Sequence, residues 1–321
     1  MSIDDDFVFR PLSNVAPVTP TVEFATAGVQ ETLALADDPL GPLAQLRGIW
    51  KGTGLNTIWR PLFDPSNPGQ KHFLELNLTV EQIDFTEIQG QIPNRGLLQG
   101  DLFMAGLHYM QLVSDNHNNG LHLEPGVWLT VPATTDPSVP ASVVRMGSIP
   151  HGTTILAQGV ASGEAGGPTF AVADITPFVI GDPSQKIPFP ETDLSIPTPF
   201  RSDPTLIAGI TQAMVDDPNT VLSGALTDQD VVSTTNLVIT TGPVPIIGGG
   251  TANTAFLQGD AAGPNADAVA MEAIFWIEEV RESDGSTVLQ LQYTQTVLLD
   301  FGGLSWPHVS VATLRQVSAG S

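Results

Sequence analysis

The sequence contains no cysteine. It therefore cannot form a disulfide, a zinc–thiolate site, an iron–sulfur cluster or a thiolate-ligated haem, and it offers no cysteine nucleophile. Basic residues are also scarce, because 11 Lys and Arg stand against 34 Asp and Glu, for a formal net charge of −23. Since such a surface repels phosphate backbones and anionic lipids, we expect no nucleic-acid partner and no membrane partner.

The sequence also lacks long apolar runs and the marks of a secretory signal. No apolar stretch approaches the roughly 18 residues of a membrane helix. The first ten residues, MSIDDDFVFR, are acidic where a signal peptide is basic. These features predict a cytoplasmic protein. The chain still has 321 residues, 41% of them apolar, which is enough for a buried core.

Proline and glycine divide the chain into regions of different character. Residues 1–40 are rich in Pro, Thr and Asp without periodicity, and they predict an irregular leader. Residues 41–317 are expected to form one domain built from short strands that alternate apolar and polar side chains, typical of an antiparallel barrel or sandwich. The expected strands after the first two are 97–113, 121–131, 142–146, 153–160, 231–240, 252–258 and a hairpin of 268–281 with 288–297.

Residues 162–264 interrupt this pattern with Pro-rich and Gly-rich connections and are expected to be an insertion. One amphipathic helix is predicted inside it, with Asp203 as N-cap and Pro204 as the first helical residue. Its apolar face would consist of Leu206, Ile207, Ile210 and Met214. The fold class is therefore all-β with a helix-containing insertion.

The stretch 292–316 has the pattern of two strands joined by a Gly302-Gly303 turn, and its second strand carries His308. A histidine held on a rigid closing strand is the best candidate in this chain for a metal or haem ligand. Alternation places Ser310 and Ala312 on the same face as His308. These small neighbours would leave room for a flat macrocycle. The competing interpretation is a histidine satisfied on an exposed barrel face.

Four separated segments together resemble the nitrobindin family of haem-binding β-barrels. They are GIWKGTG at 48–54, LHLEPGVW at 121–128, IPHG at 149–152 and PHVSVATLR at 307–315. Their order and approximate positions agree with that family. The match covers about 41–160 and 268–317, so the leader and the insertion lie outside it, and the chain has about twice the usual length of the family.

The resemblance implies a ten-stranded calycin-like, or lipocalin-like, antiparallel barrel whose open end receives haem b, with His308 as the proximal iron ligand. His151 stands where the family has threonine in the distal turn, so it would hydrogen-bond a distal ligand, act as a general base or ligate iron itself. Trp306, Trp50 and Ile149 are the further expected cofactor contacts. The implied chemistry is peroxynitrite isomerisation or nitric oxide binding, with a peroxidase-like reaction as competitor.

Other interpretations stay open at this point. If His308 faces outward, the same barrel would be a carrier of a small hydrophobic ligand, with the predicted helix as a lid. A purely structural protein is a third alternative, and a homodimer through a barrel edge or the insertion is also open. His122 and Glu124 share one strand face and would form a buried polar pair, or an ion pair with Arg145 or Arg95.

Overall fold

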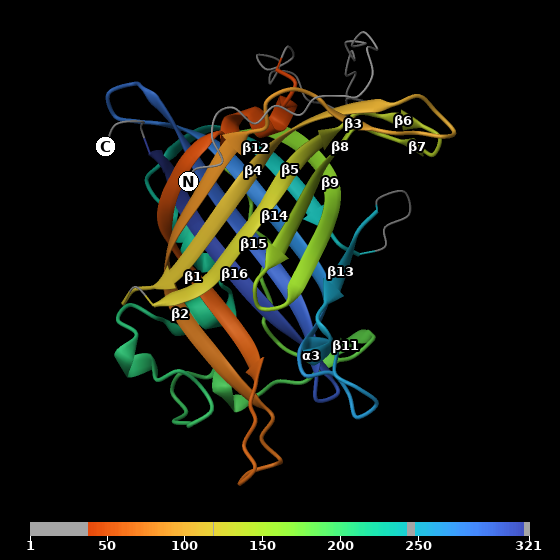
Figure 1. The fold of residues 1–321 in the computed structure, drawn as a ribbon. Coiled ribbons are helices and arrows are strands. Elements are labelled where there is room, and N and C mark those ends of the chain that lie inside the picture. Colours follow the sequence, from red (N-terminus) through yellow and green to blue (C-terminus); the bar gives the residue numbers. More distant parts are fainter. Residues whose placement is uncertain (1–37, 118, 243–247, 318–321) are drawn as a thin grey trace.

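The computed structural model describes residues 38–117, 119–242 and 248–317. Ten antiparallel strands form a barrel (Figure 1), and the last of them, β16, pairs with β1 to close it. In order around the barrel they are β1 (Gly48–Pro61), β2 (His72–Glu87), β4 (Leu102–Asp115), β5 (Gly120–Val131), β8 (Ser142–Ile149), β9 (Thr153–Ala165), β12 (Asp230–Thr240), β14 (Asp267–Arg281), β15 (Thr287–Phe301) and β16 (Leu304–Val317). The predicted all-β barrel is confirmed.

The remaining elements are short. The small strands are β3 (Ile92–Asn94), β6 (Thr134–Thr135), β7 (Ser138–Val139), β10 (Phe178–Val179), β11 (Asp182–Lys186) and β13 (Gly250–Asn253). The helical elements are the 3₁₀ helices η2 (Gly41–Leu46), η3 (Pro190–Thr192) and η4 (Pro204–Leu206) and the α-helices α1 (Gln212–Asp216), α2 (Thr220–Ala225) and α3 (Ala255–Gln258). Across the described ranges, every helix is too short or too polar to cross a bilayer.

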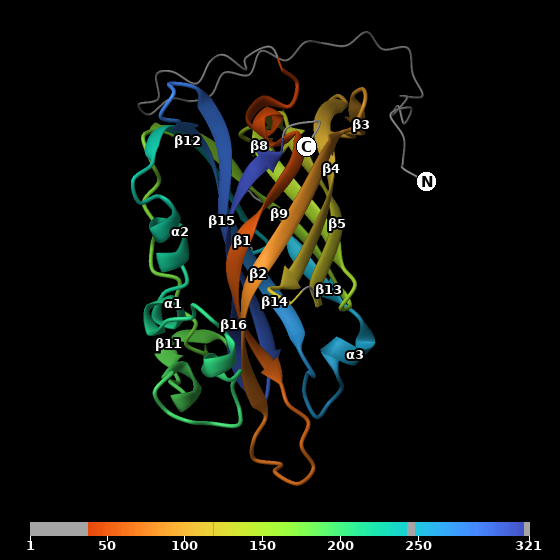
Figure 2. The ribbon, with the colours of Figure 1, turned by 90° about the vertical axis from the view of Figure 1, so that its left-hand side faces the viewer.

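The period of two in each strand separates a lumen face from an outer face. Apolar and aromatic side chains fill one half of the lumen, and Trp50, Phe85, Trp128 and Phe275 are large members of this cluster. The short helix η2 lies over this end of the barrel (Figure 2) and adds Leu43 to the same cluster. Trp50 Nε1 donates a hydrogen bond to the carbonyl of Leu46, which fixes the helix to the first strand. This end of the barrel is therefore closed by packing.

Residues 166–229 lie along one outer flank of the barrel (Figure 2). They form a second apolar cluster with the outer faces of β1, β2 and β16, in which Leu55, Trp59 and Val309 pack with Ile175 and Leu222. The outer face of these strands is therefore buried in part, as well as their lumen face.

The predicted boundaries of the insertion differ from the structure at its end. Strand β12 is a member of the barrel wall, between β9 and β14, so the part of 162–264 that lies outside the barrel before it is residues 166–229. The predicted strand 252–258 is also only partly present, as β13 followed by α3. Most of the predicted leader, residues 1–37, lies outside the described residues.

The predicted helix after Asp203 is wrong. Asp203 does cap, since its carboxylate accepts a hydrogen bond from the backbone N–H of Thr205, but the capped element is only the 3₁₀ turn η4. Gly209 then adopts a left-handed φ of 98°, and a new cap at Thr211 begins α1. Ile207, Ile210 and Met214 still pack on the outer cluster. Their apolar spacing thus reflects contact with the barrel wall rather than one continuous helix.

Glu278, on the outer face of β14, is a buried carboxyl with a titration close to neutrality. Its side chain is inaccessible to solvent, and its Oε1 has no partner among the described residues, while Oε2 accepts a hydrogen bond from Gln290 Nε2 at 2.6 Å. Burial raises the pKa of Glu278 to about 7, against partial compensation by Gln290 and Arg315. A carboxyl of this kind folds most favourably in its protonated form.

The stability of the fold is expected to depend on pH through Glu278. Because its folded-state pKa exceeds its ordinary value, its contribution to stability is complete below about pH 4.5 and is lost as pH rises through about 7. At pH 8 the free energy of unfolding of Glu278→Gln is therefore expected to exceed that of wild type by about 2–3 kcal/mol, as measured by urea denaturation. Near pH 4.5 the two proteins are expected to be equally stable. A variant that is equally shifted at both pH values would contradict this assignment.

Candidate functional site in the barrel lumen

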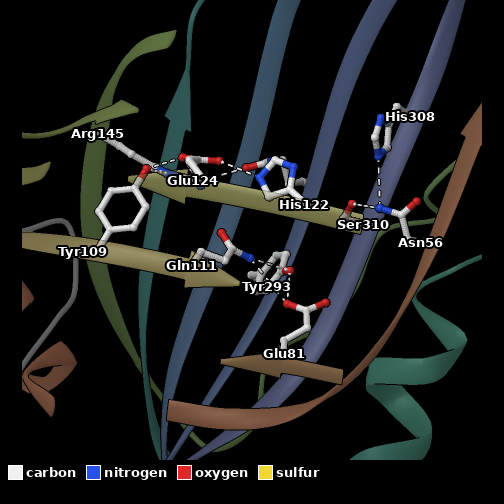
Figure 3. A network of polar contacts seen from close by, with 11 residues as sticks. Asn56, Glu81, Tyr109, Gln111, His122, Glu124, Arg145, Tyr293, His308 and Ser310 are labelled. Carbon is white, nitrogen blue, oxygen red and sulfur yellow. Dashed lines mark hydrogen bonds and ion pairs between the residues drawn. The ribbon is translucent and has the colours of Figure 1, made fainter. Parts of the chain in front are cut away.

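A network of polar side chains crosses the other half of the lumen (Figure 3). Arg145 on β8 is its centre, with Nη2 donating to Glu124 Oε1 at 2.7 Å and Nε donating to the Tyr109 hydroxyl at 3.0 Å. Arg145 Nη1 reaches Gln295 Oε1 on β15 at 2.7 Å. Tyr109 also donates its hydroxyl proton to Glu124. One guanidinium thereby joins β4, β5, β8 and β15 through the inside of the barrel.

The ionisation of this network is fixed by its contacts. Burial alone would raise the pKa of Glu124, but the charge of Arg145 and the hydrogen bonds from His122 and Tyr109 outweigh burial and lower that pKa to about 2. Glu124 is therefore a carboxylate throughout the physiological range. Burial raises the pKa of Tyr109, so its hydroxyl stays protonated and serves as a donor. The site holds one buried ion pair of fixed charge.

The close packing of the ion pair depends on Gly147. A Cβ placed on Gly147 would lie 2.4 Å from Glu124 Oε1 and 2.7 Å from the Tyr109 hydroxyl oxygen. Any larger residue would push the carboxylate away from Arg145. A glycine is therefore required at this position of β8, because Glu124 and Tyr109 occupy the space that a side chain would need.

A second carboxyl group lies beside this ion pair, on β2. Glu81 accepts hydrogen bonds from Tyr293 Oη at 2.5 Å and from Thr79 Oγ1 at 2.8 Å, and Gln111 Nε2 donates to Tyr293 Oη at 3.1 Å. Burial raises the pKa of Glu81, although these donors oppose the rise. Burial and the adjacent Glu81 also raise the pKa of Tyr293. Glu81 therefore binds a proton more readily than Glu124.

His308 faces the lumen, as its spacing with Ser310 and Ala312 predicts. Its cross-strand neighbour on the same face is Val297, and its Nε2 lies 3.0 Å from Asn56 Nδ2. Asn56 Nδ2 also donates to Ser310 Oγ at 2.7 Å. Burial, together with the charges that His122 and His151 would carry, lowers the pKa of His308 to about 3. His308 is consequently a neutral imidazole, and part of its surface is accessible.

Two further histidines lie on the β5 and β8 side of the lumen. His122 Nε2 is 3.2 Å from Glu124 Oε2, and the His122 ring stacks on that of His151 with centroids 5.8 Å apart. His151 is in the turn between β8 and β9 and is exposed. Although the residue is exposed, partial burial of its ring and the neighbouring His122 lower the pKa of His151. The predicted pair of His122 with Glu124 is confirmed, and Arg145 rather than Arg95 completes it.

The structure does not bring all of the predicted cofactor contacts together. Trp50 pairs with Gln316 on β16, eight residues from His308, which corresponds to about 27 Å along the strand. Trp306 packs at the barrel end against Phe301, Phe189 and His72. Ile149 is the last residue of β8 and lies next to the turn that carries His151. Of the expected contacts, His151 and Ile149 are therefore neighbours, and Trp50 belongs to the packed end of the lumen.

The donor set has consequences for the metals that this lumen could hold. Within the described parts of the chain, no three His, Asp or Glu side chains are close enough together to coordinate a bare metal ion. A haem needs only one protein ligand, and a neutral imidazole such as His308 is the ligating form. A shallow cavity of about 320 Å³ outside the barrel, lined by Pro168, Phe170 and Asp217 among others, includes none of these residues.

Several members of the network were not expected from the sequence. Asn56, Tyr109, Gln111, Glu81 and Tyr293 all occupy lumen positions of strands whose other face is apolar or exposed. A search of each expected strand for polar residues two apart would have found Glu81 and Thr79, and Tyr109 and Gln111. Nothing in the sequence tells which strands face one another across the lumen.

Comparison with known proteins adds no relative: no family model, no curated protein and no solved structure matches this chain.

Proposed function

We propose that this protein binds haem b in the lumen with His308 as the iron ligand, and that it acts on small reactive nitrogen or oxygen species. The observation that carries the proposal is His308 itself, a neutral and partly accessible imidazole on the lumen face of β16. The four segments that resemble nitrobindins supply the cofactor class, and the closed ten-stranded barrel is the fold that this resemblance implies. The neutral imidazole of His308 is the form that ligates haem iron.

The partner of His308 favours ligand binding over oxygen activation. Its hydrogen-bonding neighbour is the neutral amide of Asn56, with no carboxylate bonded to the ring among the described residues. A carboxylate partner would make the imidazole a stronger electron donor. Because Asn56 occupies Nε2 and Nδ1 has no hydrogen-bond partner among the described residues, Nδ1 would be the nitrogen that holds iron, and Asn56 would stay as the neutral partner of the ring. When bound, a ferric haem supplies a redox-active Lewis acid for nitric oxide, peroxynitrite or peroxide.

The carrier alternative has less support. A fatty acid needs a free cation for its carboxylate, but the lumen guanidinium of Arg145 is already neutralised by Glu124. A long acyl chain also needs an apolar tunnel, and the apolar half of the lumen is filled by Trp50, Trp128 and Phe275. A small neutral ligand would meet neither obstacle, so it is the form of the carrier hypothesis that an experiment must test.

The test is a titration of the purified protein with haemin, followed by visible absorption. Wild type is expected to develop a Soret band with one haemin per chain, and His308→Ala is expected to bind at least 100-fold more weakly because the axial bond is lost. His117→Ala is the matched control, since His117 is exposed in the turn before β5. A wild type without a Soret band, or a His308→Ala variant with an unchanged one, would contradict the proposal.

A further inference from the structure

We infer that His122 is the proton acceptor of the lumen and that the ligands it serves are small weak acids, which must lose a proton in order to bind. This inference rests on the proposed function and deepens it. It gives a chemical role to a residue that the sequence alone assigned to structure. Three features support this role: the contact of His122 with Glu124, the contact of Glu124 with Arg145, and the lumen that His122 shares with His308.

The contact with Glu124 fixes the tautomer of His122. Glu124 is an ionised carboxylate and can only accept, so the Nε2 atom of His122, 3.2 Å away, must carry the hydrogen. In the neutral ring, Nδ1 then bears the lone pair. The His122 side chain is 20% exposed, and within the described ranges Nδ1 has no hydrogen-bond partner. His122 therefore presents a free basic nitrogen inside the lumen.

Glu124 is held so that it can support a charged His122. Its other oxygen, Oε1, takes hydrogen bonds from Arg145 Nη2 and from the Tyr109 hydroxyl, and its side chain is inaccessible to solvent. The carboxylate cannot rotate away without leaving the guanidinium unpaired. A carboxylate behind an imidazole orients the ring and stabilises the imidazolium that forms when the ring accepts a proton. Glu124 is thus a positioning residue for His122.

Besides Glu124, three titratable groups lie around His122, and they are Glu81, His151 and His308. A charge on His122 would lower the pKa of Glu81 on β2. The ring of His151, in the turn after β8, stacks on the ring of His122. His308 lies on the lumen face of β16, and a charge on His122 would lower its pKa. His151 is exposed, and no carboxylate bonds to its ring among the described residues, so it lacks the support that Glu124 gives His122. His122 is therefore better placed than His151 to accept a proton.

The proposed step is a simple proton transfer. A weak acid HX enters the lumen, its proton moves to the lone pair on Nδ1 of His122, and the anion X⁻ remains to be bound. The positive charge on His122 is balanced by Glu124, and the same proton returns to the anion, or to water, when the ligand leaves. The step involves no oxidation or reduction. Hydrogen cyanide and peroxynitrous acid are acids of this class.

Stopped-flow binding to the haemin-loaded protein tests the inference with two probes. Hydrogen cyanide must lose a proton to bind as cyanide, whereas nitric oxide has no proton to lose. His122→Gln is expected to slow cyanide association by about 100-fold, the usual contribution of a positioned base, and to leave nitric oxide association unchanged. Glutamine keeps a polar neighbour for Glu124, and it leaves the Glu124–Arg145 ion pair in place. His117→Ala serves again as the control.

Each outcome of that experiment decides the point. If cyanide and nitric oxide slow equally in His122→Gln, His122 affects access or folding, and the inference fails. It fails too if His151→Ala slows cyanide while His122→Gln does not. If haemin does not bind at all, the proposed function fails, but His122 can still be tested in the haem-free protein by ¹⁵N NMR of the histidine rings. A neutral His122 with its hydrogen on Nδ1 would overturn the inference, and one with its hydrogen on Nε2 supports it.

Discussion

Replacing Arg145 by methionine is expected to destabilise the barrel by about 3–5 kcal/mol. The substitution preserves much of the side-chain volume but leaves Glu124 as a buried carboxylate without its cation. It also removes the donors to Tyr109 and Gln295, so two more lumen side chains lose a partner. Because the side chains of both ionic partners are almost inaccessible to solvent, water cannot replace the lost contacts. Urea denaturation at pH 7 measures the effect.

Two comparison variants separate the ion pair from simple loss of charge. Arg281→Met breaks the pair with Asp230, in which both side chains are more than half exposed, and it is expected to cost less than about 1 kcal/mol. The double variant Glu124→Gln with Arg145→Met removes both charges and is expected to recover most of the lost stability. If Arg145→Met and Arg281→Met cost the same, the lumen network is not a determinant of stability.

The strands were predictable because each one faces two different environments. Alternation in 121–131 and 231–240 follows from one face in the lumen and one outside, and both stretches are strands in the structure with nearly the same limits. The hairpin of 268–281 with 288–297 is also confirmed, with its turn at Ser283–Gly285. A local pattern suffices here, since the side-chain period of a strand is a local property.

The helix after Asp203 was not predictable for the opposite reason. Its apolar residues are spaced as on a helix face, but they pack on the outer wall of the barrel, which is formed by strands distant in sequence such as β1, β2 and β16. Gly209 adopts a conformation that few other residues tolerate and ends the first turn. Tertiary contacts with the wall therefore override a helical pattern that is only moderately strong.

The candidate site was predictable in part. The lumen face of His308 follows from its small neighbours on β16, and the pairing of His122 with Glu124 follows from their spacing on β5. The Arg145 contact could be named only as one of two alternatives, and Arg95 instead pairs with Asp101 near the surface. Which side chains meet across the lumen depends on the closure of the barrel and on strand register, and a single sequence does not encode these in any local pattern.

Asn56→Asp is expected to raise the pKa of His308 from about 3 to about 5, as a carboxylate in contact with an imidazole favours its charged form. An NMR titration of the His308 ring protons measures this change directly. In wild type the fold becomes less stable as pH falls from about 6.5 toward 3, because His308 is protonated in the unfolded chain and stays neutral in the folded chain. Asn56→Asp should weaken this acid sensitivity.

Asn77→Asp is the matched control for that prediction. Asn77 is the cross-strand neighbour of Asn56 on β2, but its amide bonds to Glu75 rather than to His308. A shift of the His308 pKa in Asn56→Asp alone would establish that the Asn56 amide keeps this imidazole neutral, the form in which it can bind iron. Equal shifts in both variants would mean that His308 responds to the general potential of the lumen. The neutral partner would then have no specific role in the choice between ligand binding and oxygen activation.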